Sequence, residues 1–283
     1  MVKSVHRKRS RDFILLKKLW RVILGKARDE SQCNRCTVCG CKGVAFLPLP
    51  DVYRANALRH GFVHFGKGEM TAHDTYTCGH CGASDRERMY MLWIGQQIEK
   101  GFFNNCTRTI HFAPEAALSK RLRALRVFNY ETADLLMNDV DHRVDMTSMP
   151  FEDESFDFFV CSHVLEHVEN DDQAIKELYR ITKHGGSGIL VAPIVVGLDR
   201  TVEDPNVIDA VGRWRLFGQD DHVRLYAHAD YVSKIRRHGF RIEELGMAYF
   251  GAEIFRSLGL KPTSILYVVH KSDLVRSCDT YSV

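Results

Sequence analysis

The 283-residue sequence contains no apolar run that approaches the roughly 20 residues a helix needs to cross a bilayer. It also lacks a secretory signal of the usual kind, because Lys17 and Lys18 interrupt the apolar stretch near the N-terminus and no small-residue cleavage site follows. We therefore expect a chain that is neither an integral membrane protein nor secreted. With 45% apolar residues, the chain can bury a full core and hold one main domain and a small second one.

The chain has little excess charge outside its N-terminus. The formal net charge is +3, yet residues 1–30 hold ten Lys or Arg residues against three Asp or Glu residues. The rest of the chain is therefore mildly acidic, which argues against nucleic acid as the main partner of its functional surface.

Residues 1–32 form a basic arm with an amphipathic segment at Phe13–Leu24. On a helix, Lys17, Lys18 and Arg21 fall on one narrow arc and most apolar residues on the other. One interpretation is peripheral contact with an anionic membrane through residues 1–30, with Trp20 at headgroup level. The alternatives are a helix that packs on the protein's own body and a disordered tail. The first interpretation predicts a cytoplasmic protein at the inner membrane face.

Nine cysteines without a secretory signal indicate a reducing compartment, where paired cysteines bind metal more often than they form disulfides. Two C-x-x-C-G motifs, CTVCG and CGHCG, supply the four thiolates of a closed structural Zn²⁺ site. A redox pair and unligated thiols are the alternatives. Cys33 offers a second register for the first motif, but Gly40 favours the register that pairs Cys36 with Cys39. The predicted ligands are Cys36, Cys39, Cys78 and Cys81.

A helix is expected directly after the second motif, because Met89, Leu92 and Trp93 recur at helical spacing within residues 83–102. We assign residues 33–95 to a zinc-ribbon-like module with this linking helix. Residues 96–283 form the main domain.

From residue 107 onward, short apolar runs alternate with helical stretches. This alternation predicts an α/β domain with a mostly parallel sheet covered on both faces, and ligands that bind at the carboxyl ends of the strands. One predicted helix begins with Pro114 in its first turn, and another is stopped by Gly185 and Gly186. The predicted strands are residues 107–113, 127–135, 141–146, 155–164, 186–194, 240–247 and 264–271, and the predicted helices are residues 114–125, 172–182 and 231–239.

Two aspartates stand where a nucleoside would need them. Asp134 follows the second predicted strand, in reach of ribose hydroxyls, and Asp145 closes the third, in reach of an adenine amino group. A lone aspartate at a strand end is more often a turn or cap residue, so the order and spacing of the two carry the interpretation.

Three segments, TADL, VDMTSMPFEDESFDFFVCSHVLEHV and LYRITKHGGSGILVAPI, resemble in order the motifs of class I S-adenosylmethionine-dependent methyltransferases, in particular the type 11 group. The resemblance covers about residues 107–270. It implies a Rossmann-like seven-stranded sheet whose last strand is antiparallel, and S-adenosylmethionine as cofactor. It also implies Asp134 on the ribose, Asp145 and Met146 beside the adenine, and Ser162 with His163 at the floor of the active site. The implied cofactor-binding residues are Phe112, Ala113, Pro114, Glu115, Asp134, Leu135, Asp145, Met146, Ser162 and His163.

The first motif, HFAPE, departs from the family pattern because it contains no glycine. We expect a tight strand-to-helix turn in which Ala113 is small enough to let the cofactor approach the backbone. HFAPE, the cysteine motifs and GQDDHVRLY further resemble a bacterial subset often associated with glycan synthesis. The resemblance therefore implies an acceptor hydroxyl on a sugar or other glycan precursor.

HVLEH, residues 163–167, fits the H-x-x-E-H pattern of certain zinc proteases. In this context the motif straddles a strand end and a short turn, so we reject the protease interpretation. We expect His163 to face the active-site pocket, and Glu166 and His167 to organise the turn.

The long loop after the fifth predicted strand, residues 195–227, is expected to be a lid or binding loop. Arg213, Arg215, Arg224 and Tyr226 could contact the acceptor, although a solvated insertion held by salt bridges is the alternative. The predicted catalytic residues are His222, with Asp221 to orient its ring, and His163. Two rival functions are a zinc-containing RNA methyltransferase and a non-catalytic cofactor-binding scaffold.

Overall fold

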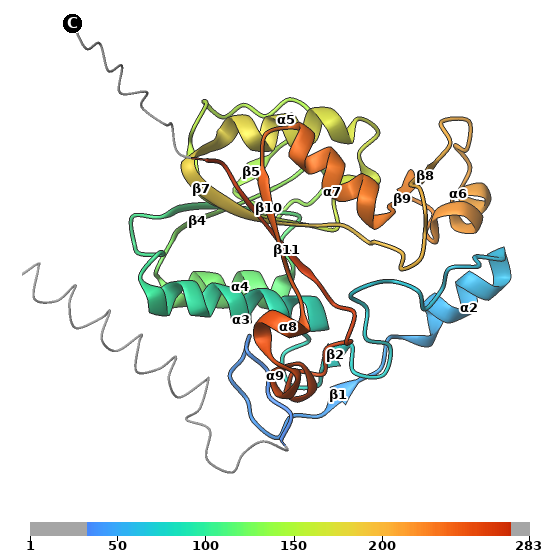
Figure 1. Cartoon of the computed structure of the whole chain (residues 1–283), viewed down its shortest axis with the longest axis horizontal. Coiled ribbons are helices and arrows are strands. Elements are labelled where there is room, and N and C mark those ends of the chain that lie inside the picture. The colour runs from blue at the N-terminus through green and yellow to red at the C-terminus, as the bar shows by residue number, and fades with distance from the viewer. Residues whose placement is uncertain (1–32, 273–283) are drawn as a thin grey trace, which may run out of the picture.

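The computed structural model describes residues 33–272, so the predictions for the basic arm, its membrane contact included, fall outside the described residues. A seven-stranded sheet lies at the centre (Figure 1), with the order β10-β11-β7-β6-β3-β4-β5. Strands β7, β6, β3, β4 and β5 run parallel, and β11 runs antiparallel to both of its neighbours. The expected α/β fold with a Rossmann-like methyltransferase sheet is confirmed. The strands are β3 (Arg108–Phe112), β4 (Asn129–Asp134), β5 (His142–Arg143), β6 (Phe156–Ser162), β7 (Thr182–Val191), β10 (Arg241–Leu245) and β11 (Leu266–His270).

Helices cover both faces of the sheet, as Figure 1 shows: α3 (Asp85–Lys100) and α4 (Ala116–Leu125) on one side, α5 (Asp171–Ile181) and α7 (His228–Arg237) on the other. Ser84 starts α3 with a capping box to Glu87, which satisfies two backbone donors at the helix start. Because α3 buries most of its surface, it packs as part of the core.

The N-terminal module contains β1 (Phe46–Leu47), β2 (Thr77–Cys78) and α2 (Asp51–His60). The fully buried Arg88 of α3 ties it to the main domain. Its guanidinium donates to the carbonyls of Thr75 (2.5 Å), Tyr76 (3.0 Å), Ala83 (3.0 Å) and Leu258 (2.8 Å). The proposed division at residues 95 and 96 stays a prediction.

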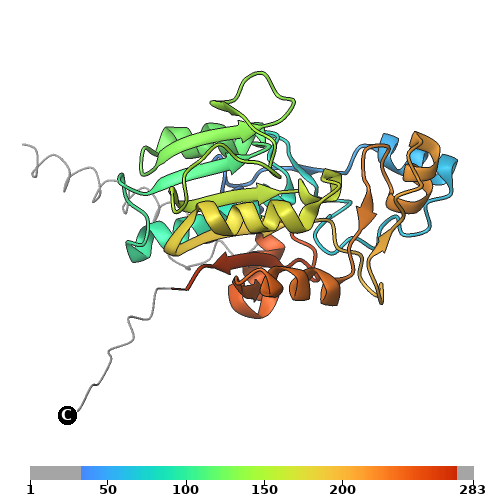
Figure 2. The ribbon, with the colours of Figure 1, turned by 90° about the horizontal axis from the view of Figure 1, so that it is seen from above.

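The loop after β7 carries β8 (Val202–Glu203), α6 (Ala210–Phe217) and β9 (Arg224–Leu225), and β8 pairs with β9. We call residues 193–227 the lid. In both Figure 1 and Figure 2, α6 of the lid lies beside α2 of the module. His60 stacks on Trp214 across this contact, with ring centroids 5.5 Å apart. Two short helices, α8 (Met247–Phe250) and α9 (Ala252–Ser257), precede β11.

Two predicted element ends are wrong. Helix α4 begins at Ala116, after Glu115 as its cap, so Pro114 precedes the helix. Helix α5 ends at Ile181 and β7 starts at the next residue, so the glycines that were expected to stop the helix lie inside the strand. Glycine is needed within β7 for packing, since a Cβ atom at Gly188 would lie 2.3 Å from the ring of Phe159. Among residues 33–272, no helix is long and apolar enough to span a membrane.

Candidate functional site

The predicted cofactor residues lie along one edge of the sheet, because the carboxyl ends of β3, β4, β5, β6 and β7 share that edge. Two turns at this edge have unusual backbones. Ala113 after β3 has φ 46°, and His163 after β6 has φ 56°, both in the left-handed region that non-glycine residues rarely adopt. Ala113 therefore takes up the conformation for which related motifs use glycine. Its N–H donates to Ala133 O of β4 at 2.9 Å, which keeps the turn close to the next strand.

Asp134 and Asp145 each use the carboxylate oxygen Oδ1 to hold the loop that follows. Asp134 Oδ1 accepts from the N–H groups of Leu136 and Met137 at 2.7 Å. Asp145 Oδ1 accepts from the N–H and hydroxyl of Thr147, which lowers the pKa of Asp145. Both aspartates therefore hold the turn that follows them, which was the alternative interpretation. These contacts use only Oδ1, so Oδ2 of each aspartate is left for a ligand. Beside them, Leu135 is exposed and Met146 is buried.

Other predicted residues are joined to the buried core. Glu115 Oε2 lies 2.8 Å from Nε2 of the fully buried His111. The hydroxyl of Ser162 is hydrogen-bonded to that of Tyr90 at 3.0 Å and is buried at the end of β6, so its place at the floor of an active site stays a prediction. Phe112 is buried at the end of β3.

A pocket of about 270 Å³, which we call the edge pocket, lies where β6 and β7 end. Its walls come from three parts of the chain: the module at residues 49–86, the turn at residues 163–167 and the lid. The module and lid are also joined by backbone, because Glu69 N donates to Ile194 O and Val196 N to Lys67 O. The lining includes Tyr53, His64, Phe65, His73, Tyr76, Arg86, His163, Glu166, His167 and His222.

The HVLEH turn differs from its prediction, because Glu166 and His167 line the edge pocket as well as His163. Residues 165–167 form a 3-10 turn, which directs both side chains toward the lid. Glu166 is fully buried, with Nδ1 of His163 3.2 Å from its Oε1. Burial alone would raise the pKa of Glu166, but the nearby histidines outweigh it and lower the pKa, so the group is a carboxylate at neutral pH.

His222 is buried and faces the same turn, and its ring lies 4.7 Å from that of His167. The expected pairing of Asp221 with His222 is not observed. Asp221 Oδ2 instead lies 3.3 Å from Nδ1 of His167, while Nδ1 of His222 lies 3.3 Å from the carbonyl of Phe217. Burial lowers the pKa of His222 and of His163, which keeps both rings neutral near pH 7.

Two lid residues that were expected to face the acceptor are used inside the fold. Arg224 is buried and donates to the carbonyls of Leu165 and Glu169 at 2.7 Å. Tyr226 is buried and donates to Asp171 Oδ2 at 2.5 Å. Of the other two, Arg213 is half-buried and Arg215 is exposed. The lid is thus fixed to the HVLEH turn by hydrogen bonds from Arg224 to backbone carbonyls.

The four predicted zinc ligands come together, with sulfurs within 4.8 Å of one another. In both motifs the glycine after the second cysteine, Gly40 and Gly82, has a left-handed φ near 80°, and its N–H donates to the carbonyl of the first cysteine. Burial raises the pKa of Cys36 and that of Cys81, the latter to about 12. Four crowded thiols of this kind fit a cation that stabilises them as thiolates. Cys39, Cys41 and His80 form an overlapping group.

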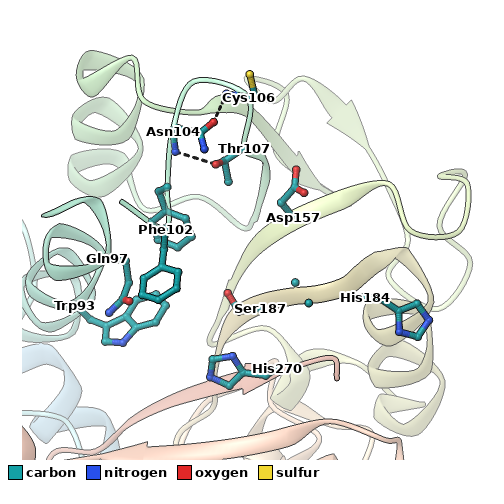
Figure 3. A pocket seen from close by; sticks show the side chains of 13 residues that line it. Trp93, Gln97, Phe102, Asn104, Cys106, Thr107, Asp157, His184, Ser187 and His270 are labelled. Atoms are coloured by element: carbon teal, nitrogen blue, oxygen red, sulfur yellow. Dashed lines mark hydrogen bonds between the residues drawn. The ribbon is translucent and has the colours of Figure 1, made fainter. Parts of the chain in front are cut away.

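A second cavity, of about 440 Å³, lies at the opposite end of the sheet (Figure 3). It is lined by Trp93 and Gln97 of α3, Asp157 at the start of β6, and Ser187 and His270. Since ligands of open α/β sheets bind at the carboxyl ends of the strands, this cavity is not a candidate for the cofactor.

The contribution of the module to the edge pocket was not predicted from the sequence. Residues 49–76 were assigned no role, although they supply Tyr53, His64, Phe65, His73 and Tyr76. The available signal was the density of histidines and aromatics between the two cysteine motifs. Arg86 was also missed: it lines the pocket from α3, and the pKa of His163 is lowered first by burial and then by the positive charge of Arg86.

Comparison with known proteins finds a family model that is similar to the central segment. Residues 109–190 match the family model described as a methyltransferase domain. The chain is 44% identical over 46 residues to a demethylmenaquinone methyltransferase of Streptomyces avermitilis, which is 16% of this chain and 20% of that protein. It is 48% identical over 42 residues to an uncharacterized protein of Methanocaldococcus jannaschii, 15% of this chain and 20% of that protein.

The chain thus spans about a fifth of the length of these curated relatives. Among solved structures, it is similar to the YcgJ protein of Bacillus subtilis, with 14% identity, a TM-score of 0.40 and coverage of 62% of this chain and 94% of that one. The strand order and the family match agree on the same segment of the chain. Residues 109–190, which run from β3 to β7 of the central sheet, therefore match the model of a methyltransferase domain.

Proposed function

We propose that the chain transfers a methyl group from S-adenosylmethionine to a hydroxyl of a sugar or other glycan precursor. The position of the edge pocket carries this proposal. It reaches His163 at the end of β6, on the same sheet edge as Ala113, Asp134 and Asp145. A cofactor held along that edge would present its methyl group to an acceptor in the pocket.

The lining of the edge pocket supports a hydroxylated acceptor. Aromatic rings at Tyr53, Phe65 and Tyr76 supply flat apolar walls, and a few polar groups converge between them, as is usual for sites that orient a small ligand. Arg86 lines the pocket and interacts electrostatically with Glu115, which precedes α4. It suits a carboxylate, such as that of the methionine moiety.

Methyl transfer to oxygen requires alignment of the acceptor with the sulfonium and removal of the hydroxyl proton. The acceptor oxygen bonds to the methyl carbon, and the carbon–sulfur bond breaks with its electron pair going to sulfur. A neutral imidazole can accept the proton, and both His163 and His222 are neutral at the pocket. A positioned base contributes a factor of roughly 10² to 10⁴ in rate.

The test is transfer of labelled methyl groups from S-adenosylmethionine to separate pools of glycan precursors and RNA, with purified full-length protein. We expect label in the glycan pool, and a loss of roughly 10² in turnover for His163→Ala or His222→Ala at saturating cofactor. A matched control is Arg200→Ala, an exposed lid residue that does not line the edge pocket. Label in RNA alone would support the RNA methyltransferase instead. Cofactor binding without label in either pool would support the non-catalytic scaffold.

A further inference from the structure

Glu166, His167 and His222 form a compact group in the edge pocket. One ligand atom from each residue lies within 4.8 Å of the others. An ion with ligand bonds of about 2.1 Å holds its ligand atoms roughly 3 to 4 Å apart, so small side-chain movements close the group around a cation. Two residues come from the turn after β6 and the third from the lid, so the group joins the two walls of the pocket.

The hydrogen bonding of these residues leaves buried atoms without partners. Neither carboxylate oxygen of Glu166 has a hydrogen-bond partner of acceptable geometry, although the side chain is fully buried. Nε2 of His222 is likewise buried without a partner. Buried polar atoms normally find partners, and leaving one unsatisfied costs about 1 to 3 kcal/mol. Oε1 of Glu166 has only ion-pair contacts, of 3.2 Å with Nδ1 of His163 and 4.0 Å with Nε2 of His167, and the other two atoms have no hydrogen-bond partner, which indicates a missing electron-pair acceptor.

The outer contacts of the two histidines are those of metal ligands. Nδ1 of His222 faces the carbonyl of Phe217, which places the proton on Nδ1 and the lone pair on Nε2. Nδ1 of His167 faces Asp221, while its Nε2 lies 4.0 Å from Oε1 of Glu166. Histidines that bind metals almost always donate their other ring N–H to a carbonyl or carboxylate in this way.

We propose that Glu166, His167 and His222 bind a divalent transition-metal ion that holds the acceptor hydroxyl in the edge pocket. Two imidazoles and one carboxylate form the kind of ligand set that suits such ions and leaves positions open for substrate. This role rests on the proposed methyl transfer to oxygen. The site is separate from the four-cysteine group, whose thiolate set is closed.

A metal ion at this position would promote loss of the hydroxyl proton more effectively than a base alone. Coordination lowers the pKa of a bound hydroxyl or water, so the oxygen loses its proton near neutral pH. The proton passes to His163 or to water, the oxygen attacks the methyl carbon, and the thioether product leaves. His222 then acts as a ligand, and His163 remains the pocket histidine outside the metal group.

Metal binding can be tested without the methyl acceptor. Mn²⁺ is the probe, because it prefers oxygen and nitrogen ligands and does not compete for four thiolates. The zinc-loaded full chain is titrated with Mn²⁺, and free Mn²⁺ is followed by electron paramagnetic resonance. We expect one saturable site, with affinity reduced at least tenfold in His167→Ala, His222→Ala and the nearly isosteric Glu166→Gln. His73→Ala is the matched control, since His73 lines the same pocket outside the group.

Cofactor affinity and thermal midpoint are measured for each variant, and Glu166→Gln keeps the test valid where an alanine variant fails to fold. Absence of a saturable site in the wild type, or equal affinity in wild type and Glu166→Gln, would overturn the proposal. Saturable binding that is lost in the variants, without methyl transfer to any glycan, would leave the metal site standing and refute the proposed reaction. Transfer that is unaffected by chelators and by Glu166→Gln would refute the catalytic role of the ion.

Discussion

Asp134→Asn separates the cofactor role of Asp134 from its role in the loop. The amide oxygen of asparagine can replace Oδ1, which accepts from Leu136 and Met137, so the loop after β4 keeps both hydrogen bonds. The NH₂ group replaces the second carboxylate oxygen. It donates rather than accepts, so a ribose held there as predicted would lose the acceptor for its hydroxyl protons. Alanine at this position would remove both the loop hydrogen bonds and the predicted ligand contact. A loss of affinity could then come from either change.

The expected loss of S-adenosylmethionine affinity is about 1 to 3 kcal/mol, which corresponds to roughly 5-fold to 150-fold in Kd. The lower end applies if only one hydroxyl is bound, because Asp134 is half-buried and water can partly replace the contact. The assay is calorimetry with S-adenosylmethionine and with S-adenosylhomocysteine. Asp139→Asn, an exposed aspartate in the same loop, is the control. Equal affinity in wild type and Asp134→Asn, with the loop unchanged in hydrogen exchange, would show that Asp134 does not bind the cofactor.

Three further predictions concern the fold. We predict that the four-cysteine group binds one zinc ion and that serine at both Cys78 and Cys81 abolishes this binding in a colorimetric zinc assay. Equal zinc content in wild type and the double variant would contradict the ligand assignment. Arg88→Met should lower the free energy of unfolding by about 3 to 5 kcal/mol, because four carbonyls inside the fold lose a charged donor. Urea denaturation measures this change, and the exposed control Arg54→Met should alter the free energy of unfolding little. Burial raises the pKa of Glu69 from 4.5 to about 7, so the native state favours the protonated form and the wild type loses stability as pH rises from about 4.5 to 7. Glu69→Gln should therefore gain up to about 3 kcal/mol relative to wild type between pH 4.5 and pH 8, and a difference that stays constant with pH would contradict the raised pKa.

The sheet was predictable because its strands are buried on both faces and therefore appear as apolar runs in the sequence. β3, β6 and β11 were predicted for this reason, and all have continuous buried stretches. The end of α5 was not predictable in the same way. Its last turn passes directly into β7, and the glycines that usually signal a helix end lie inside that strand, where a Cβ atom at Gly186 would lie 2.8 Å from the carbonyl oxygen of Lys183.

The residues of the candidate site that lie at strand ends could be proposed from the sequence. The contacts between the lid and the turn after β6 could not, because they depend on tertiary structure. Asp134 and Asp145 follow strands, so their shared edge could be deduced from the order of the elements. The approach of His222 to Glu166 could not, because it depends on the path of the lid and on Arg224, which holds the lid against the turn. Residues 49–76 have no periodic pattern that points to a pocket wall.

The edge pocket is formed by the module, the turn after β6 and the lid, and this division affects how specificity for the proposed acceptor can change. The cofactor residues lie on strand ends that also form the core, so substitutions there affect stability as well as binding. The acceptor walls come largely from residues 49–76 and from the lid, which lie outside the central sheet. Substitutions in those two segments can alter the shape and polarity of the acceptor site while the sheet edge stays intact. A population of related chains could therefore diversify in acceptor while retaining one cofactor and one fold.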